Sequence, residues 1–225
     1  MELRYVYIFF QLIAFLFAIS IHESAHAWMA SRCGDPTARM LGRITLNPLR
    51  HIDPVGTILL PAIALFTGFP MIGWAKPTPV DPRNFKNPMR DDILISIAGP
   101  ASNFLVVFVT IILLGLLALT SPSAHYVVHG MARSMILDVN GITPLALMLH
   151  QLMVINILLG IFNLIPVPPL DGSHVLRHLL PDGIRQVYDS VGMFALMALV
   201  FFGGSLLMAL IRPVLGVYIS VLMAI

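Results

Sequence analysis

Three polar residues that commonly bind metal or transfer protons lie inside an apolar segment long enough to cross a bilayer. Residues 12–30 read LIAFLFAISIHESAHAWMA and include His22, Glu23 and His26. On an α-helix, residues four apart share a face, so both imidazoles can reach one ion while Glu23 lies beside it. Ionisable groups at membrane depth are costly, which favours a functional site over a polar patch that seals a helix interface. The pattern predicts a zinc-dependent protease site within the membrane.

The composition of the whole chain is that of an integral membrane protein. Of its 225 residues, 58% are hydrophobic and 11% are charged, whereas about a quarter are charged in an average soluble domain. The formal net charge is only +2, and the basic residues lie in loops beside apolar segments, so we expect no nucleic-acid partner. A single cysteine, Cys33, allows no internal disulfide. The first apolar run is followed by no cleavage pattern, so we expect it to be retained.

The distribution of apolar runs predicts an all-α polytopic membrane protein, a helical bundle that forms one domain over residues 1–225. We expect a three-helix catalytic core at about 5–31, 92–119 and 143–180, with one or more additional helices at 187–225. The run at 55–69 contains Pro61 and reaches only ~22 Å at about 1.5 Å per residue, less than the ~30 Å hydrocarbon core. We therefore interpret it as re-entrant or interfacial. Whether 213–225 spans stays open.

The thirteen lysines and arginines favour one topology. If 55–69 does not cross, ten of them share one side, and only Arg4, Arg133 and Arg212 lie opposite. Positive charge gathers on the cytoplasmic side of membrane proteins. This distribution predicts a multi-pass protein of the cell membrane, with its N-terminus outside and its active site toward the cytoplasm.

Two loop segments show patterns typical of short strands. Residues 42–47 alternate between apolar and polar types, and residues 73–80, GWAKPTPV, could pair with them, although Pro77 and Pro79 restrict this second segment to an edge. We therefore expect a small juxtamembrane β-hairpin or sheet; ordinary connectors are an equally acceptable interpretation. An exposed strand at 42–47 could hold an unwound substrate segment by strand addition.

A catalytic zinc usually has three protein ligands, so two histidines require a third partner. Asp171 follows the helix-breaking residues 165–169 and, in the favoured topology, returns to the membrane face where the first helix ends. The alternative interpretation is structural, because Asp-Gly after prolines is common in turns and Asp can cap a helix. A glutamate ligand is excluded, since the only glutamate besides Glu23 is Glu2, which lies too far along the first helix.

Several motifs in order resemble the site-2 protease family of intramembrane zinc metalloproteases. They are HESAH at 22–26, GPASN at 99–103 and NLIPVPPLDG at 163–172, and the intervening segments 41–61 and 73–80 also resemble compact members without a PDZ or CBS domain. The resemblance covers about residues 10–180. It implies that His22, His26 and Asp171 bind one Zn²⁺, that Glu23 is the catalytic carboxylate, that Asn163 lines the site and that Asn103 supports helix packing or positions groups near it.

The resulting functional hypothesis is an intramembrane zinc endopeptidase that cuts peptide bonds in or near transmembrane segments of membrane proteins. Glu23 would accept a proton from water and deliver it to the leaving amine, and Asn163 is a candidate donor to the oxyanion. Asn163 could instead cap its helix or bond to another helix. The alternative function is a non-catalytic membrane protein, either a metal-binding transporter or a helix-recognising scaffold. The partners implied are a transmembrane substrate and the lipid bilayer; oligomeric state stays open.

Other histidines fit weaker interpretations. His125 and His129 have helical metal spacing but lie in a loop on the opposite side without a nearby carboxylate, so we expect a solvated surface there. His174 and His178 follow Asp171 at the same spacing and form a rival candidate for a metal cluster.

Overall fold

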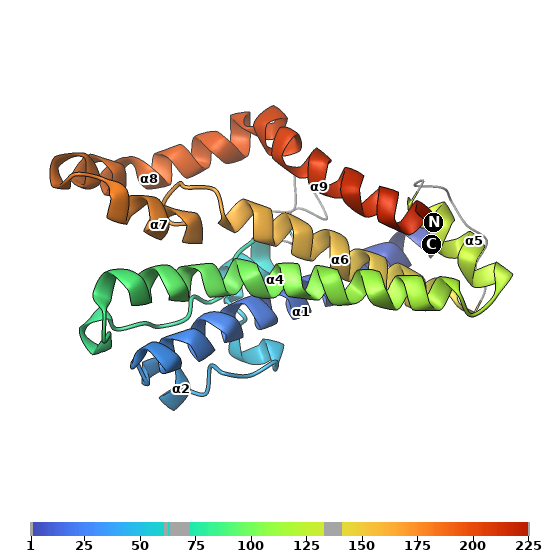
Figure 1. Cartoon of the computed structure of the whole chain (residues 1–225), viewed down its shortest axis with the longest axis horizontal. Coiled ribbons are helices and arrows are strands. Elements are labelled where there is room, and N and C mark those ends of the chain that lie inside the picture. The colour runs from blue at the N-terminus through green and yellow to red at the C-terminus, as the bar shows by residue number, and fades with distance from the viewer. Residues whose placement is uncertain (1, 61–62, 64–72, 133–140, 225) are drawn as a thin grey trace. The chain divides into compact units, whose positions relative to one another are not determined.

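Helices make up most of the computed structural model, which describes residues 2–60, 63, 73–132 and 141–224 (Figure 1). Among the residues described, five helices are long and apolar enough to cross a membrane: α1 (Glu2–Cys33), α4 (Pro88–Ala118), α6 (Thr143–Asn163), α8 (Asp182–Phe202) and α9 (Gly204–Ala224). A helix satisfies its own backbone hydrogen bonds, which a segment in lipid requires. The prediction of an all-α polytopic membrane protein is confirmed.

The C-terminal region, predicted to hold one or more helices over residues 187–225, contains two helices whose bounds do not separate at residue 213. α8 ends at Phe202 with Gly203 as its C-cap, α9 begins at Gly204, and Pro213 lies inside α9. Adjacent glycines end a helix readily because they lose the most conformational freedom on ordering. Proline is tolerated inside membrane helices when neighbouring groups satisfy the freed carbonyl. Residues 213–224 therefore belong to a helix of spanning length.

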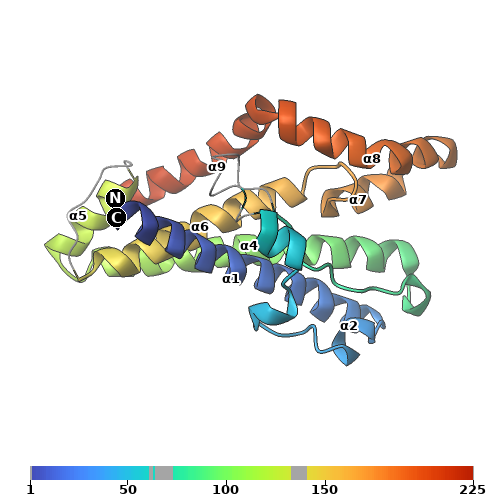
Figure 2. The same ribbon diagram turned by 180° about the vertical axis from the view of Figure 1, so that it is seen from behind.

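By its internal contacts the chain divides into two units, which we call the connector unit (Ile19–Gly99) and the bundle unit (Met1–Ala18 with Pro100–Ile225). The boundary falls inside α1 and α4. In the bundle unit, α9 packs along α6, while α5 (Pro122–Ala132) contacts both and α8 contacts α9 (Figures 1 and 2). Its core is apolar and includes Leu114, Met153, Ile157, Tyr218 and Leu222. The prediction of a single catalytic domain over the whole chain stays a prediction.

A buried amide pair connects α4 to α6 within the bundle unit. Asn103 Nδ2 donates to Asn156 Oδ1 at 2.7 Å, and Asn156 Nδ2 donates to the Leu152 carbonyl of its own helix at 2.6 Å. Both asparagines are fully buried. Such bonds hold membrane helices together where apolar packing alone gives little preference over lipid. The expected role of Asn103 in helix packing agrees with this contact.

The connector unit contains α2 (Thr37–Met40) and the short helices η1 (Pro48–Arg50), η2 (Pro54–Leu59) and η3 (Pro82–Asn84). Figures 1 and 2 show α2 beside the C-terminal part of α1. The expectation of a re-entrant or interfacial segment at 55–69 falls largely on residues outside those described, so it stays a prediction. Arg133 also lies outside them.

The predicted β-hairpin is wrong, because no strand occurs among the described residues. Gly42 has φ +67°, and the Thr45 N–H donates to the Arg43 carbonyl at 3.0 Å, so residues 42–47 turn instead of extending. Pro77 and Pro79 offer no N–H to a ladder. The two segments are connected instead by the Arg43 guanidinium, which donates to the carbonyls of Lys76 and, at 3.0 Å, Pro77. The strand-addition hypothesis for 42–47 loses its basis.

Asp35 joins the end of α1 to the segment before α4. Its fully buried carboxylate accepts hydrogen bonds from the Thr37 hydroxyl, the Asp81 N–H at 2.8 Å and Asn84 Nδ2 at 2.9 Å. Burial acts to raise the pKa of Asp35, but these hydrogen bonds prevail and lower the pKa below its ordinary value. The carboxylate therefore stays ionised and holds the segment that contains Asp81 and Asn84 against the C-terminal end of α1.

Candidate metal centre

Two imidazoles of α1 meet in the connector unit. Nε2 of His22 and Nε2 of His26 lie 3.0 Å apart, and the two rings are nearly perpendicular. Both side chains are almost completely buried. Two nitrogen ligands at about 2.0–2.1 Å from a tetrahedral zinc lie about 3.3 Å apart. The pair therefore has the spacing that a shared zinc requires.

The backbone of α4 orients the second imidazole. Nδ1 of His26 lies 2.7 Å from the Ile95 carbonyl oxygen, and a carbonyl can only accept, so Nδ1 carries the proton. In the neutral ring the lone pair is then on Nε2, the atom that faces His22. Metal-binding histidines are typically fixed in this way by a second hydrogen bond.

Gly99 lets α4 approach both imidazoles. A Cβ at this position would lie 2.3 Å from Nε2 of His26 and 2.6 Å from Cε1 of His22. Real Cβ atoms do not approach so closely, so the two rings occupy the space that any other residue would fill. The sequence motif GPASN contains Gly99, but its contact with the histidines could not be derived from the motif alone.

Glu23 is held on the same helix by Thr78. The Thr78 N–H donates to Glu23 Oε2 at 2.8 Å, and the Thr78 hydroxyl lies 2.7 Å from the same oxygen. The buried Arg43 guanidinium also interacts electrostatically with Glu23: burial lowers the pKa of Arg43, and the nearby carboxylate opposes that change. Arginine remains charged in either case. Sequence reasoning missed Thr78, and its place between two prolines was the only available signal.

Asp171 begins α7 (Asp171–Leu179) in the bundle unit, after the proline-rich turn that follows α6. A Cβ on Gly172 would lie 2.2 Å from the Leu164 carbonyl oxygen, which explains why glycine follows the aspartate. The turn is fixed against α8, where the Tyr188 hydroxyl donates to the Pro166 carbonyl at 3.0 Å. Asp171 thus follows a turn that a hydrogen bond from α8 holds in place.

Asn163 is the last residue of α6, and its Nδ2 donates to the Leu159 carbonyl of the same helix at 3.0 Å. This bond within α6 fits the interpretation of Asn163 as a residue that caps its helix. Its proposed role as a donor to the oxyanion stays a prediction. The remaining histidine pairs form no metal cluster within the described ranges. The rings of His125 and His129 stack at 4.0 Å, and His125 is exposed.

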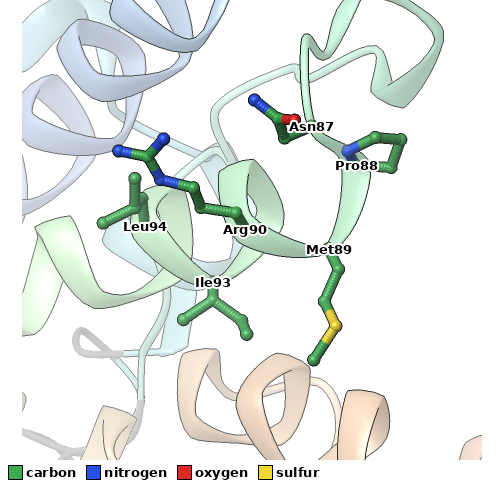
Figure 3. Close-up of a pocket in the computed structure, with 6 residues that line it drawn as sticks. All are labelled: Asn87, Pro88, Met89, Arg90, Ile93 and Leu94. Atoms are coloured by element: carbon green, nitrogen blue, oxygen red, sulfur yellow. The ribbon is translucent and has the colours of Figure 1, made fainter.

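A shallow hollow of about 520 Å³ lies beside the first turns of α4 and is not the metal centre (Figure 3). It is lined by Asn87, Pro88, Met89, Arg90, Ile93 and Leu94. None of these is a histidine, cysteine or carboxylate, so the hollow offers no side chain of the kinds that bind zinc.

Comparisons with known proteins agree with this chemistry. The sequence pattern of Peptidase family M50 matches residues 10–203. The candidate zinc metalloprotease YwhC of Bacillus subtilis is 39% identical over 173 residues, which cover 77% of this chain and 70% of that protein. The candidate zinc metalloprotease Rip2 of Mycolicibacterium smegmatis is 32% identical, over 82% of this chain and 63% of its own length. No solved structure matches the chain.

A match over most of the chain, the two facing imidazoles and the adjacent glutamate all indicate the same chemistry. The implied cofactor is therefore zinc, and the chain is an enzyme of the membrane rather than a transporter or scaffold. The protein belongs to peptidase family M50, the site-2 protease family of intramembrane zinc metalloproteases.

Proposed function

We propose that His22, His26 and Asp171 bind one zinc ion and that Glu23 transfers protons during hydrolysis of peptide bonds in or near transmembrane segments. The observation that carries this proposal is the pair of buried imidazoles 3.0 Å apart, with Glu23 on the adjoining position of α1. Two imidazoles and one carboxylate would match the donor set of a catalytic zinc site that keeps one position for water.

When bound, zinc supplies a Lewis acid that activates water and polarises the carbonyl of the substrate. The chain's own residues handle the protons and the orientation. Glu23 accepts a proton at its carboxylate and returns it to the leaving amine. His26 keeps its proton on Nδ1 through the Ile95 carbonyl, which directs Nε2 toward its metal-binding role.

Asn163 is proposed as a donor to the oxyanion that develops on the substrate. Its Nδ2 bonds to the Leu159 carbonyl, and a rotation about the side-chain torsions would release that donor. We further propose that the active site lies toward the cytoplasm, because ten of the thirteen basic residues share the side of the connector in the favoured topology. Water would enter from that side.

The proposed substrates are single-span or multi-span membrane proteins. A peptide bond within a helix is shielded by side chains and by its own hydrogen bonds, so the substrate must unwind locally before hydrolysis. Cleavage of a single-span model substrate by the purified chain in proteoliposomes tests this activity. We expect a chelator to abolish cleavage and added Zn²⁺ to restore it, whereas added Mg²⁺ should not, since magnesium prefers six oxygen ligands. Cleavage that persists after the zinc has been removed would contradict the proposal.

Replacement of Asp171 by asparagine should weaken zinc binding. The change keeps the shape of the side chain but removes the charge, and loss of a direct ligand should cost at least the roughly 10- to 100-fold typical of outer-shell partners. Zinc content after dialysis against a graded chelator measures the effect. Asp189→Asn is the matched control, because that carboxylate is paired with Arg177 at 2.9 Å and is partly exposed. Equal zinc retention by both variants would remove Asp171 from the ligand set.

A further inference from the structure

We propose that Thr78 is a positioning residue for the carboxylate of Glu23, an inference that rests on the proteolytic role proposed above for Glu23. Both residues belong to the connector unit. Thr78 lies in the segment that precedes η3, 55 residues away from Glu23 along the chain. The contact therefore depends on the fold of the connector and not on helix geometry alone.

The two donors of Thr78 converge on a single oxygen. Its N–H lies 2.8 Å and its hydroxyl 2.7 Å from Glu23 Oε2, and the hydroxyl is also 2.9 Å from the Glu23 carbonyl oxygen. A hydroxyl has one proton, so at any moment it donates to one of these two acceptors, whereas the N–H is directed at the carboxylate throughout. The backbone donor is thus the constant part of the contact.

The segment around Thr78 is built to present that N–H. Pro77 and Pro79 flank it, and the residue before a proline is restricted to extended conformations. Neither proline has an N–H, so only Thr78 donates from this stretch. Arg43 fixes the segment from the other side, since its guanidinium donates to the Pro77 carbonyl at 3.0 Å and to that of Lys76. The donor is therefore held in place before any substrate arrives.

In this arrangement the two carboxylate oxygens of Glu23 have different roles. Both bonds from Thr78 go to Oε2, which leaves Oε1 of Glu23 for proton transfer with water. A glutamate side chain has several rotatable bonds, and ordering it during the reaction would cost conformational entropy. Fixing the carboxylate in advance lowers this cost and favours turnover more than substrate binding.

Three variants separate the two donors. Thr78→Val removes the hydroxyl and keeps the N–H, and Thr78→Ser keeps both. Replacement of the Thr78 amide by an ester, through the corresponding α-hydroxy acid, removes the N–H and keeps the hydroxyl, and it also weakens the Pro77 carbonyl that accepts from Arg43. Hydrogen bonds to charged groups are among the stronger ones, so we expect kcat to fall about 10- to 100-fold in the ester variant, by less in Thr78→Val, and to recover in Thr78→Ser. KM and zinc content should change little.

Thr120→Val is the matched control, because Thr120 lies in the turn after α4 and its exposed hydroxyl donates to the Leu117 carbonyl at the end of that helix. It should cleave at the native rate. An unchanged kcat in both Thr78→Val and the ester variant would overturn the inference. An equal loss of zinc or of thermal stability in those variants would also overturn it, because the role would then be structural.

A second measurement does not depend on cleavage. The chain has only two glutamates, Glu2 and Glu23, so ¹³C-labelled glutamate in a Glu2→Gln background gives one carboxylate band in the infrared spectrum. We expect this band to shift in the ester and Thr78→Val variants and to stay in place in Thr120→Val. A shifted band in a protein that cleaves nothing would remove the proposed function while keeping the contact. An unshifted band in an active protein would remove only the inference.

Discussion

Replacement of Glu23 by glutamine should reduce cleavage about 10³-fold while the protein keeps its zinc. General acid–base catalysis by a positioned side chain typically contributes about 10²- to 10⁴-fold. Glutamine has nearly the same shape, and its carbonyl oxygen can still accept the hydrogen bonds from Thr78. It cannot accept a proton from water at neutral pH. Single-turnover cleavage in proteoliposomes, measured beside the zinc content of the same sample, separates chemistry from metal binding.

The control for this change is Glu2→Gln, which alters the only other glutamate of the chain near its N-terminus. It should leave both cleavage and zinc content at native values. A zinc-loaded Glu23→Gln protein that cleaves as fast as the native chain would exclude Glu23 as the proton acceptor. Loss of zinc from this variant would instead assign Glu23 a role in holding the metal.

Replacement of Gly99 by alanine should disrupt the histidine pair itself. The added methyl group would lie 2.3 Å from Nε2 of His26, and both imidazoles would have to move or α4 would have to retreat. A displacement of about 1 Å at a catalytic centre can cost about 10²-fold in rate. We therefore expect at least that loss of cleavage, together with weaker zinc binding. Zinc titration and cleavage assays on the same preparation measure both effects.

Gly216→Ala in α9 provides the same chemical change in a spanning helix, where a Cβ would meet nothing within 4 Å. Alanine is a better helix former than glycine, so neither variant should lose helix content, which circular dichroism checks. Full zinc affinity and full activity in Gly99→Ala would mean that the imidazoles do not lie against α4.

The sequence was sufficient for those features that arise from local patterns. Apolar runs gave the spanning helices, since length and hydrophobicity decide that outcome directly. The HESAH spacing placed His22 and His26 on one helix face, and the structure brings their Nε2 atoms together. The match to a metalloprotease family supports zinc as the cofactor.

Features that depend on contacts between distant segments were not predictable in this way. The alternation at 42–47 favoured a strand, but the buried Arg43 turns this segment toward the carbonyls of Lys76 and Pro77. Likewise, a glycine in a helix gives no sign of what lies against it, so the contact of Gly99 with the two histidines depends on the tertiary fold. The placement of Asp171 and the function of Asn163 remain proposals, because they depend on tertiary arrangement rather than on local pattern.

Backbone and side-chain hydrogen bonds hold two segments of the connector unit together. The Trp74 N–H donates to the Gly56 carbonyl at 3.3 Å, the Thr57 hydroxyl donates to the Trp74 carbonyl at 2.8 Å, and the Lys76 N–H donates to the His51 carbonyl at 2.9 Å. These hydrogen bonds hold residues 51–57 against residues 74–76. The entropy of closing a loop grows only slowly with its length. The contacts of Arg43 with the carbonyls of Lys76 and Pro77 lie beyond these hydrogen bonds, so they should depend on the residues that make this closure and not on the length of the chain between Leu59 and Gly73.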